Sequence, residues 1–234
     1  MNIIVFALWG DDNKYWKGAV RNIEISSKLL PEWICHFYID KNCKPELIDS
    51  ISGDNVKVIL MDSSDVKISN IERFNHIGLF WRFLPLSDKS IVNIISRDCD
   101  SRIGYREISA INEWIDSDKD FHIMRDHPYH GVPILSGMWG ARNGILSNIN
   151  ELLSEWDKFE NKGKYQAEDQ DFLGQLIYPL VKENTFEHSE FGISFGGEIK
   201  KFTSERLNFE FVGDVFDEND ERHPDFFKVI ENIK

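Results

Sequence analysis

Two aspartates, Asp98 and Asp100, stand directly after the apolar run Ile91–Ile95. In an extended segment, side chains two residues apart point to the same face, so the two carboxylates would lie together. Mg²⁺ and Mn²⁺ commonly bind one or two protein carboxylates and complete their coordination with substrate phosphates and water. The pair therefore predicts a site for Mn²⁺ or Mg²⁺. The alternative is a solvated turn in which the flanking Arg97 and Arg102 form surface ion pairs.

An arginine lies among large apolar residues in the segment Gly78–Ser90, which reads GLFWRFLPLSDKS. Arg82 stands between Trp81 and Phe83, on a stretch that we expect to be helical. A guanidinium in such surroundings requires an anionic partner. A diphosphate or the Asp98 carboxylate would serve, and the alternative is an arginine whose charged head reaches solvent beyond an apolar stem.

Three acidic residues, Glu168, Asp169 and Asp171, cluster at the start of a further predicted helix. Acidic side chains at this end of a helix commonly cap it. A carboxylate here can also orient or deprotonate a hydroxyl group of an acceptor. Asp169 and Asp171 are therefore the candidate catalytic residues, and capping is the role that suits Asp171 best.

The segment Met124–Gly144 is rich in glycine and aromatic residues. Gly137 and Gly140 bracket Met138 and Trp139, and glycine lets a backbone approach a ligand closely. Aromatic faces such as that of Trp139 suit the apolar C–H surfaces of sugar rings.

Apolar segments alternate with segments of helical periodicity along most of the chain, which predicts an α/β fold with a mostly parallel central sheet flanked by helices. Ligands of such sheets bind at the carboxyl ends of the strands, and Asp98 and Asp100 follow the fourth predicted strand. Strands are expected at Ile3–Leu8, Trp33–Asp40, Val56–Asp62, Ile91–Ile95, Phe121–Asp126 and Met138–Ala141. Helices are expected at Trp16–Leu30, Pro45–Ser52, Leu79–Leu86, Tyr105–Ser117, Ile145–Phe159 and Gln170–Tyr178.

The later part of the chain shows weaker patterns. From Phe186 on, the sequence predicts loops with short strands, and the charged tail from about Phe216 is expected to wrap the surface. No clear domain boundary is visible. We therefore expect one domain over residues 1–234, with a core of about 1–180 and a C-terminal extension, 181–234, that completes the site.

The chain of 234 residues is acidic, with a formal net charge of −13 and a pI of about 5.0. Nucleic acid is not expected as a partner of such a chain. No stretch approaches the roughly 18 apolar residues of a membrane span, and the three cysteines form no CxxC pair. We expect a cytoplasmic protein without a transmembrane segment, and peripheral association with a membrane through a partner is compatible with the sequence.

Four of these pieces, in this order, resemble the GT-A nucleotide-sugar glycosyltransferases, with the likeness strongest to the group of glycogenin-like and bacterial lipopolysaccharide galactosyltransferases. The resemblance extends from Ile3 to about Pro179 and implies a Rossmann-like GT-A domain. The matching parts are FWRFLPL (80–86), IVNIISRDCD (91–100), LSGMWGAR (135–142) and EDQDFLGQL (168–176).

The resemblance implies an enzyme that moves a sugar from a nucleotide-diphosphate sugar to a saccharide or lipid-linked acceptor in surface polysaccharide synthesis. Asp98 and Asp100 would hold Mn²⁺ or Mg²⁺, which neutralises charge on the leaving nucleoside diphosphate. Asp169 would face the acceptor. The residues that would bind the nucleotide-sugar are Ala7, Leu8, Trp9 and Gly10 at the base, Arg82 and Arg97 near the phosphates, and Gly137 and Met138 on the sugar and acceptor side.

The sequence departs from the family pattern in two places. Arg97 precedes the first aspartate, where the family has an apolar residue, which leaves the donor open. The family's late histidine ligand, in an H-x-x-G-x-x-K-P-W type segment, has no match; His188 and His223 are the substitutes, and His223 is the candidate third ligand. The triplet AED at 167–169 also matches the acidic pair of inverting GT-A enzymes, so the stereochemical outcome is open.

Two alternatives remain beside the glycosyltransferase. A nucleotidyl- or phosphoryl-type transferase would use the same sheet and metal pair, but such enzymes carry a Gly-rich loop with a lysine or arginine after the first strand. Here that loop reads WGDDNKYWKG, which is acidic and aromatic. A non-catalytic sugar-binding relative is the other alternative, and the full set of acidic residues argues against it.

Overall fold

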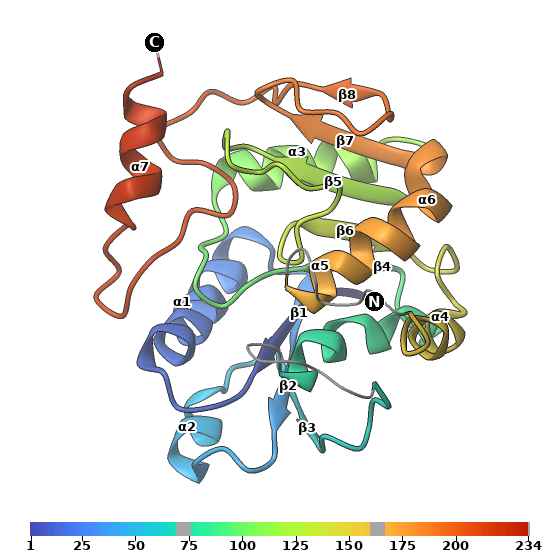
Figure 1. The fold of residues 1–234 in the computed structure, drawn as a ribbon. Coiled ribbons are helices and arrows are strands. Elements are labelled where there is room, and N and C mark those ends of the chain that lie inside the picture. The colour runs from blue at the N-terminus through green and yellow to red at the C-terminus, as the bar shows by residue number, and fades with distance from the viewer. Residues whose placement is uncertain (69–75, 160–166, 234) are drawn as a thin grey trace.

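The computed structural model describes residues 1–68, 76–159 and 167–233, and in them one eight-stranded sheet has the order β3-β2-β1-β4-β6-β5-β7-β8 (Figure 1). Neighbouring strands are parallel except that β6 is antiparallel to β4 and β5. The predicted α/β class is therefore confirmed. The strands are β1 (Asn2–Leu8), β2 (Trp33–Asp40), β3 (Val56–Met61), β4 (Asn93–Ser96), β5 (Phe121–Arg125), β6 (Trp139–Arg142), β7 (Thr185–Ser189) and β8 (Ile199–Lys200).

Helices cover both faces of this sheet. They are α1 (Asn13–Leu29), α2 (Pro45–Ser50), η1 (Ile77–Ser87), α3 (Tyr105–Ile115), α4 (Ile149–Trp156), α5 (Glu168–Phe172), η2 (Leu173–Ile177), α6 (Tyr178–Val181), η3 (Lys182–Asn184) and α7 (Pro224–Glu231). Within the described ranges, none of them is long and apolar enough to cross a bilayer.

Side chains of β1 alternate between the two faces of the sheet. Ile4, Phe6 and Leu8 belong to a buried cluster that includes residues of α1 and α3. Ile3 and Val5 belong to a second cluster, with residues of η1, α4 and α5. Burial on both faces explains why this strand is a nearly continuous apolar run in the sequence.

The order of the strands reverses next to β1. From β1 the chain proceeds to β2 and β3 on one side, and β4 then pairs with the other side of β1. In open α/β sheets such a reversal leaves a ligand-binding crevice at the carboxyl ends of the two adjoining strands. Here those ends are Leu8 and Ser96, so residues 9–12 and 97–101 border the crevice.

The six predicted strands are all present, with small shifts at their ends, but several helices differ. The predicted helix Leu79–Leu86 is part of the 3₁₀ helix η1, which contains Pro85; proline removes a backbone donor from a helix. The predicted helix Gln170–Tyr178 lies within a longer run built of α5, a π-type segment η2 and α6. Part of the expected extension belongs to the sheet, because β7 pairs with β5.

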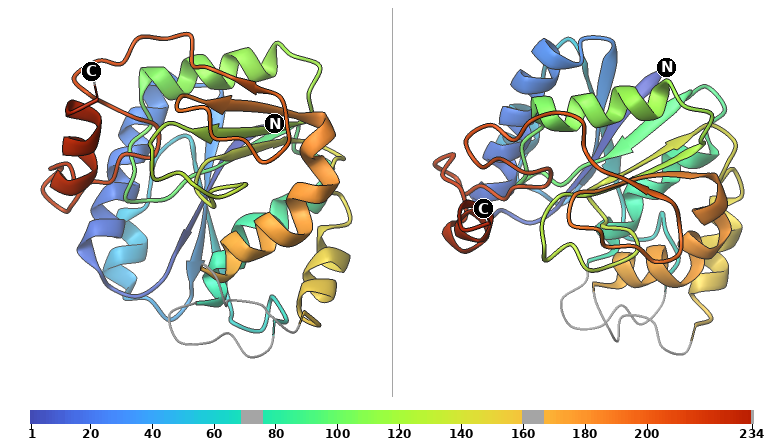
Figure 2. Two further views of the ribbon diagram at one scale, coloured as in Figure 1. Left: turned by 45° about the horizontal axis from the view of Figure 1, so that its top comes forward. Right: turned by 90° about the horizontal axis from the view of Figure 1, so that it is seen from above.

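Residues 201–233, named here the C-terminal segment, cross the molecule to the side of α1 and end in α7 (Figure 2). In all views α7 lies on the side of α1, away from α4 and α6 (Figures 1 and 2). The sequence does not predict α7; its short length and its charged flanks conceal an amphipathic pattern that buries Ile230.

Candidate active site

The aspartates Asp98 and Asp100 lie on a tight turn at the end of β4. The backbone N–H and the hydroxyl of Ser101 both donate to the Asp98 carbonyl, at 3.3 and 2.9 Å. The segment is therefore a turn and not the extended strand end from which the sequence argument placed both carboxylates on one face. Both aspartates nevertheless line the same two cavities, because the turn points them into the crevice.

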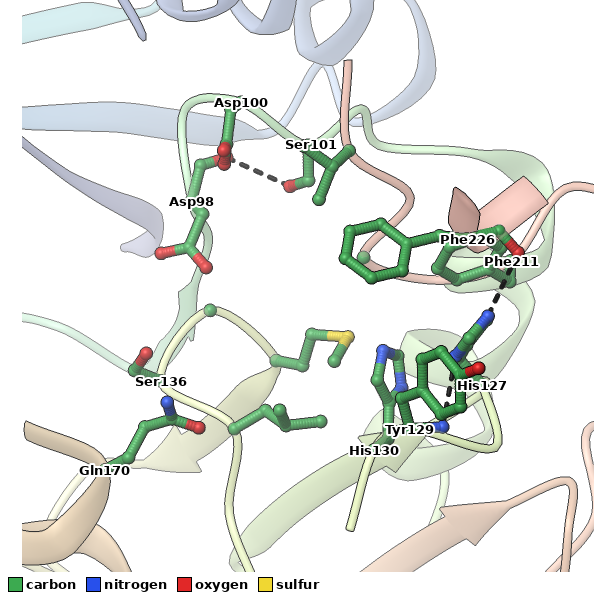
Figure 3. A pocket seen from close by; sticks show the side chains of 15 residues that line it. Asp98, Asp100, Ser101, His127, Tyr129, His130, Ser136, Gln170, Phe211 and Phe226 are labelled. Carbon is green, nitrogen blue, oxygen red and sulfur yellow. Dashed lines mark hydrogen bonds between the residues drawn. The ribbon is translucent and has the colours of Figure 1, made fainter. Parts of the chain in front are cut away.

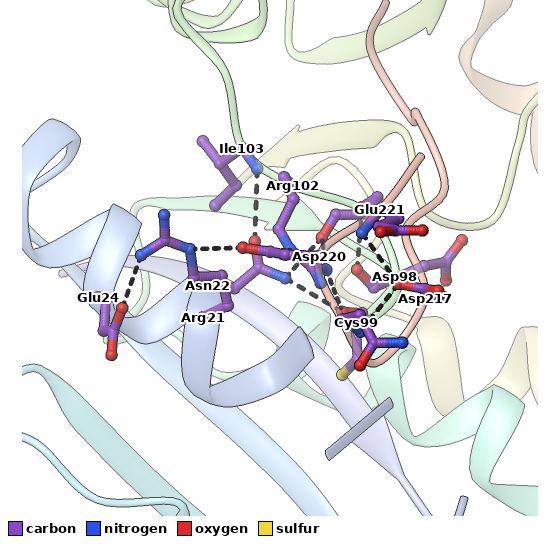
Figure 4. Close-up of polar contacts among 12 residues, drawn as sticks. Arg21, Asn22, Glu24, Asp98, Cys99, Arg102, Ile103, Asp217, Asp220 and Glu221 are labelled. Carbon is purple, nitrogen blue, oxygen red and sulfur yellow. Dashed lines mark hydrogen bonds and ion pairs between the residues drawn. The ribbon is translucent and has the colours of Figure 1, made fainter. Parts of the chain in front are cut away.

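Helix α1 packs directly against this turn. A Cβ atom on Gly18 would lie 2.0 Å from the carbonyl oxygen of Cys99, so only glycine permits the contact. The amide of Asn22, one turn further along α1, donates to the carbonyls of Cys99 and Ser101 at 3.3 and 2.8 Å (Figure 4). The turn that carries the aspartates is thus held by α1, through close packing at Gly18 and through the side-chain amide of Asn22.

The C-terminal segment also forms hydrogen bonds with the turn that carries Asp98 and Asp100. The Asp220 carboxylate accepts hydrogen bonds from Arg102, at 2.8 Å, and from Arg21 of α1, at 3.1 Å (Figure 4). The backbone N–H of Phe216 donates to the carbonyl of Asp100 at 2.8 Å. Helix α1 and the C-terminal segment therefore both contact the turn that carries the aspartate pair.

Arg82 is buried, and its guanidinium holds the opposite side of the crevice. Its Nη1 donates to Asp98 Oδ1 at 2.8 Å and to the carbonyl of Ser136 at 2.9 Å, with only 5% of the side chain exposed. The anionic partner expected from the sequence is therefore present and includes Asp98. The structure rules out the alternative of an arginine whose head reaches solvent.

Gly137 lies against the Asp98 carboxylate. A Cβ atom at this position would be 2.2 Å from Asp98 Oδ2 and 2.5 Å from its Cγ. The sequence-based expectation of close approach at Gly137 is met, although the neighbour in the structure is the carboxylate itself.

Substitution of Gly137 by alanine is expected to displace the Asp98 carboxylate from its bond with Arg82. We expect metal-dependent nucleotide binding to weaken by about tenfold, the lower end of the range for disturbed ligand placement. Titration of the nucleotide in the presence of Mn²⁺ measures this. Gly131→Ala is the matched control, because no atom lies within 4 Å of its added Cβ. Equal affinities in the two variants would contradict the assignment.

A cleft of about 580 Å³ opens between the ends of β1 and β4. It contains the predicted base-binding segment Ala7–Gly10 together with Arg82, both aspartates and Asp169. Its remaining walls are Asp11, Asp12, Tyr15, Leu79, Cys99, Ser136 and Ala167. The residues predicted for the base, for the phosphates and for the metal are thus brought together in one cleft.

A second cavity, of about 240 Å³, shares Asp98, Asp100 and Ser136 with the cleft (Figure 3). Gly137 and Met138 line this second cavity, as does the C-terminal segment. Its other walls are Ser101, His127, Tyr129, His130, Leu135, Gln170, Phe211, Gly213, Val215 and Phe226. The two cavities therefore meet at the aspartate pair.

Where the two cavities meet, each of the two aspartates is paired with one cationic side chain. Lys14 Nζ lies 2.8 Å from Asp100 Oδ2, as Arg82 Nη1 does from Asp98 Oδ1. Burial, and after it the charge of Asp98, raises the pKa of Asp100, and Lys14 opposes that rise. The two carboxylates repel one another at close range, which is the arrangement that a shared cation relieves.

The start of α5 directs three successive side chains to different places. Asp169 lines the larger cleft and Gln170 lines the smaller cavity, whereas Asp171 lines neither of the two. Helix α5 begins after Ala167, whose side chain cannot cap it, and the capping role of Asp171 stays a prediction. Because Asp171 lines neither cavity, the structure does not place it beside Asp169 as a catalytic residue. Asp169 lines the larger cleft, together with the residues predicted for the base and the phosphates, whereas the resemblance implied that it would face the acceptor.

Asp169 is fully buried, and burial raises its pKa to about 6, against the opposing charge of Arg82. Between about pH 4 and pH 6, Asp169 is therefore protonated in the folded state and ionised in the unfolded chain. The free energy of unfolding accordingly falls as the pH rises through this range. We expect wild type to lose up to about 3 kcal/mol of unfolding free energy relative to Asp169→Asn across this range. Urea denaturation of both proteins in EDTA, at pH 4.5 and 7.5, measures it. A difference between the proteins that does not change with pH would contradict the buried, raised pKa.

Three further predicted residues lie away from the cavities. Arg97 is 2% exposed and ion-paired with the buried Glu107 of α3, so its charge is used inside the protein and not at a phosphate. His188 is buried 2.9 Å from His122, inside the sheet. His223 is exposed and lines neither cavity; its ring packs on Phe226. Within the described ranges, no group of three His, Cys, Asp or Glu residues forms a metal site, so neither histidine completes one.

Sequence reasoning missed Lys14, Tyr15 and Gln170. Lys14 and Tyr15 lie in the first turn of α1, just after the acidic residues Asp11 and Asp12. Gln170 stands inside the motif EDQD, between two carboxylates that are the stronger chemical signal. The helical geometry of α5, which turns neighbours apart by about 100°, is the signal that would have drawn attention to Gln170.

No family model and no curated protein matches the chain. Its fold matches the galactosyltransferase LgtC in complex with donor and acceptor sugar analogs, with 12% identity, a TM-score of 0.54, and coverage of 98% of this chain and 95% of that one. A glycosyltransferase involved in the glycosylation of the major capsid of PBCV-1 matches with 12% identity, a TM-score of 0.50 and coverage of 80% of each chain.

The same fold also occurs in a 4-diphosphocytidyl-2C-methyl-D-erythritol synthase from Anaerococcus prevotii, with 10% identity, a TM-score of 0.50, and coverage of 83% of this chain and 91% of that one. Identities of this size show a common fold and do not show that the proteins catalyse the same reaction. The chain has the α/β fold of the GT-A glycosyltransferases.

Proposed function

We propose that the protein is a metal-dependent glycosyltransferase that moves a sugar from a nucleotide-diphosphate sugar to a saccharide or lipid-linked acceptor. One observation carries this proposal: two cavities of different size meet at Asp98 and Asp100. Group transfer between two substrates requires two binding sites whose reacting ends face one another. The larger cleft would take the nucleotide-sugar, and the smaller cavity the acceptor.

The residues at the junction fit a divalent cation. Asp98 and Asp100 supply the oxygen ligands that Mg²⁺ and Mn²⁺ use, and substrate phosphates commonly complete the coordination. Lys14 and Arg82 only balance the charges of the two aspartates. A diphosphate in the cleft brings further negative charge, and Asp169 is present as well. When bound, the ion supplies Lewis-acid stabilisation of the departing diphosphate.

The protein's own groups would bind and orient the two substrates. Ala7–Gly10 and the exposed ring of Tyr15 line the outer part of the cleft, which suits a nucleotide base. Arg82 keeps the Asp98 carboxylate in place and adds positive charge beside the phosphates. Asp169 would hold hydroxyl groups of the donor sugar, and the Gln170 amide would face the acceptor.

The larger cleft argues against a nucleotidyl-type transferase. The loop between β1 and α1 contributes Asp11 and Asp12 to the cleft wall. A loop that cradles a triphosphate needs backbone donors and basic side chains, whereas these carboxylates would repel the triphosphate.

The proposal includes a role in surface polysaccharide synthesis in the cytoplasm. The acidic site with its two cavities is compatible with that role.

Thermal-shift measurement with UDP-, GDP- and CMP-sugars, each with and without Mn²⁺, tests this proposal. A ligand that binds only the folded state raises the melting temperature by mass action. We expect one nucleotide-sugar class to raise it, and only when Mn²⁺ is present. Product analysis with that donor then shows transfer or slow hydrolysis. No shift with any donor, with or without the metal, would reject the proposal.

A further inference from the structure

The smaller cavity has one aromatic wall and one polar wall (Figure 3). His127 lies at the centre of the aromatic wall, with ring-centroid distances of 4.7 Å to Phe211, 4.9 Å to Tyr129 and 5.9 Å to Phe226. Asp98, Asp100, Ser101, Ser136 and Gln170 form the other wall. A sugar ring has the same division, with apolar C–H faces and hydroxyl groups around its edge.

Hydrogen bonds hold the aromatic wall in place. The backbone N–H of Tyr129 donates to His127 Nδ1 at 3.1 Å, so the proton is on Nε2, which donates to the Phe226 carbonyl at 3.1 Å. This bond joins the loop after β5 to α7. The wall is therefore formed before a ligand arrives, which lowers the entropic cost of binding.

Asp126 anchors the C-terminal segment on which two of these rings lie. Its fully buried carboxylate accepts hydrogen bonds from Arg106 at 2.8 Å, from Arg206 at 2.7 Å and from the backbone N–H of Val212 at 2.9 Å. Val212 follows Phe211 directly, so the position of that ring is set by a buried ion-pair network.

Among the described residues, the lining of the cavity offers no free positive charge, because Lys14 and Arg82 are already paired with its two aspartates. Its described lining includes two aspartates and neither lysine nor arginine. Burial lowers the pKa of His127 and lowers that of His130 to about 3, so both rings are neutral at neutral pH. A sugar that carries a carboxylate or a phosphate would lose water on binding and find no cationic side chain in the described lining to pair with.

We propose that the smaller cavity binds a single uncharged sugar ring at the end of the acceptor, stacked on the wall formed by Tyr129, Phe211 and Phe226. The volume of about 240 Å³ is below the usual range for drug-sized ligands, which favours one ring over a longer saccharide. This inference rests on the proposed function in calling the ligand an acceptor. The binding site itself follows from the cavity alone.

The test compares two adjacent phenylalanines of α7. Phe226 lines the cavity, whereas Phe227 packs on Phe209, with ring centroids 5.8 Å apart, and lines neither cavity. Binding of neutral methyl hexosides and of the matching methyl hexuronides is measured by saturation-transfer NMR on wild type, Phe226→Ala and Phe227→Ala. Tyr129→Ala is included because its side chain is 65% exposed, so the variant should fold normally.

We expect a neutral hexoside to bind wild type, and its hexuronide to bind at least about tenfold more weakly. The affinity for the neutral hexoside should fall about tenfold in Phe226→Ala and in Tyr129→Ala, but not in Phe227→Ala. With an active donor, the acceptor KM should rise in the same two variants while donor hydrolysis is unchanged. No hexoside binding with or without donor, equal binding of hexuronides, or equal losses in Phe226→Ala and Phe227→Ala would overturn the proposal. Hexoside binding that depends on Phe226 without turnover of any donor would support the site and reject the proposed transferase.

Discussion

The Asp100→Asn variant is expected to lose at least about 100-fold in Mn²⁺-dependent nucleotide binding, because loss of a charged ligand exceeds the 10–100-fold effect of disturbing an outer-shell partner. Folding should be nearly unchanged. Asp100 lies on a turn, and its ion pair with the partly exposed Lys14 contributes little to stability. The variant also leaves the Asp98 bond to Arg82 in place, so the arginine keeps its partner. Isothermal titration of the nucleotide, with Mn²⁺ and with EDTA, separates the metal-dependent part of the affinity.

Asp11→Asn is the matched control for this experiment. Asp11 lines the same cleft and has an ion pair of its own with Lys44, at 2.9 Å, but its side chain is 68% exposed. Both variants remove one negative charge from the cleft, so a general electrostatic effect would change them alike. If Asp100→Asn binds nucleotide with the Mn²⁺ dependence of wild type, the aspartate turn is not the metal site.

The sheet could be predicted from the sequence because its signals are local. Ile3, Val5 and their neighbours on β1 form an apolar run that only a strand covered on both faces explains. The position of Asp98 after β4 then follows from topology, since parallel strands end at one edge. Each of these steps needs only nearby residues and a general rule.

The partners of Arg82 and Arg97 could not be predicted from the residues next to them in the sequence. Arg82 stands between Trp81 and Phe83, and Arg97 between Ser96 and Asp98, and the family resemblance implies for both a place near the phosphates. In the structure, Arg97 is paired with Glu107 of α3, while Arg82 reaches Asp98 and the crevice. The difference depends on which acidic residue the fold places beside each arginine, and that is a matter of long-range packing.

The aromatic wall could not be predicted for a related reason. Phe211 and Phe226 belong to a part of the chain with weak periodicity, and they meet His127 only because buried Asp126 holds the C-terminal segment. The pattern around the three residues predicts neither contact. The sequence therefore indicates the residues of the larger cleft much better than those of the smaller cavity.

Substitution of Asp169 by asparagine is expected to reduce the rate of sugar transfer by 10²–10⁴-fold, the range for loss of a catalytic acid–base group. This carboxylate is fully buried and lines the larger cleft, which we propose for the donor, and Gln170 lines the smaller cavity, which we propose for the acceptor. Its raised pKa, about 6, would suit proton transfer near neutral pH, but its location suits contact with the donor sugar. The two roles can be separated by experiment.

Hydrolysis of the donor in the absence of acceptor decides between them. A residue that only deprotonates the acceptor is not needed for hydrolysis, so Asp169→Asn would keep the wild-type hydrolysis rate. A residue that orients the donor sugar is needed for both reactions, and we expect hydrolysis and transfer to fall together.

Asp171→Asn is the control for Asp169→Asn, because Asp171 lies two residues along the same segment and lines neither cavity. It removes a buried carboxylate, so it should lower the melting temperature while kcat stays near that of wild type. Full transfer activity in Asp169→Asn, with the loss found in Asp171→Asn, would show that the cavity lining identifies the wrong carboxylate. Loss of transfer with unchanged hydrolysis would return Asp169 to the role of acceptor base that the family resemblance implied. A parallel loss of both would establish it as a ligand of the transferred sugar.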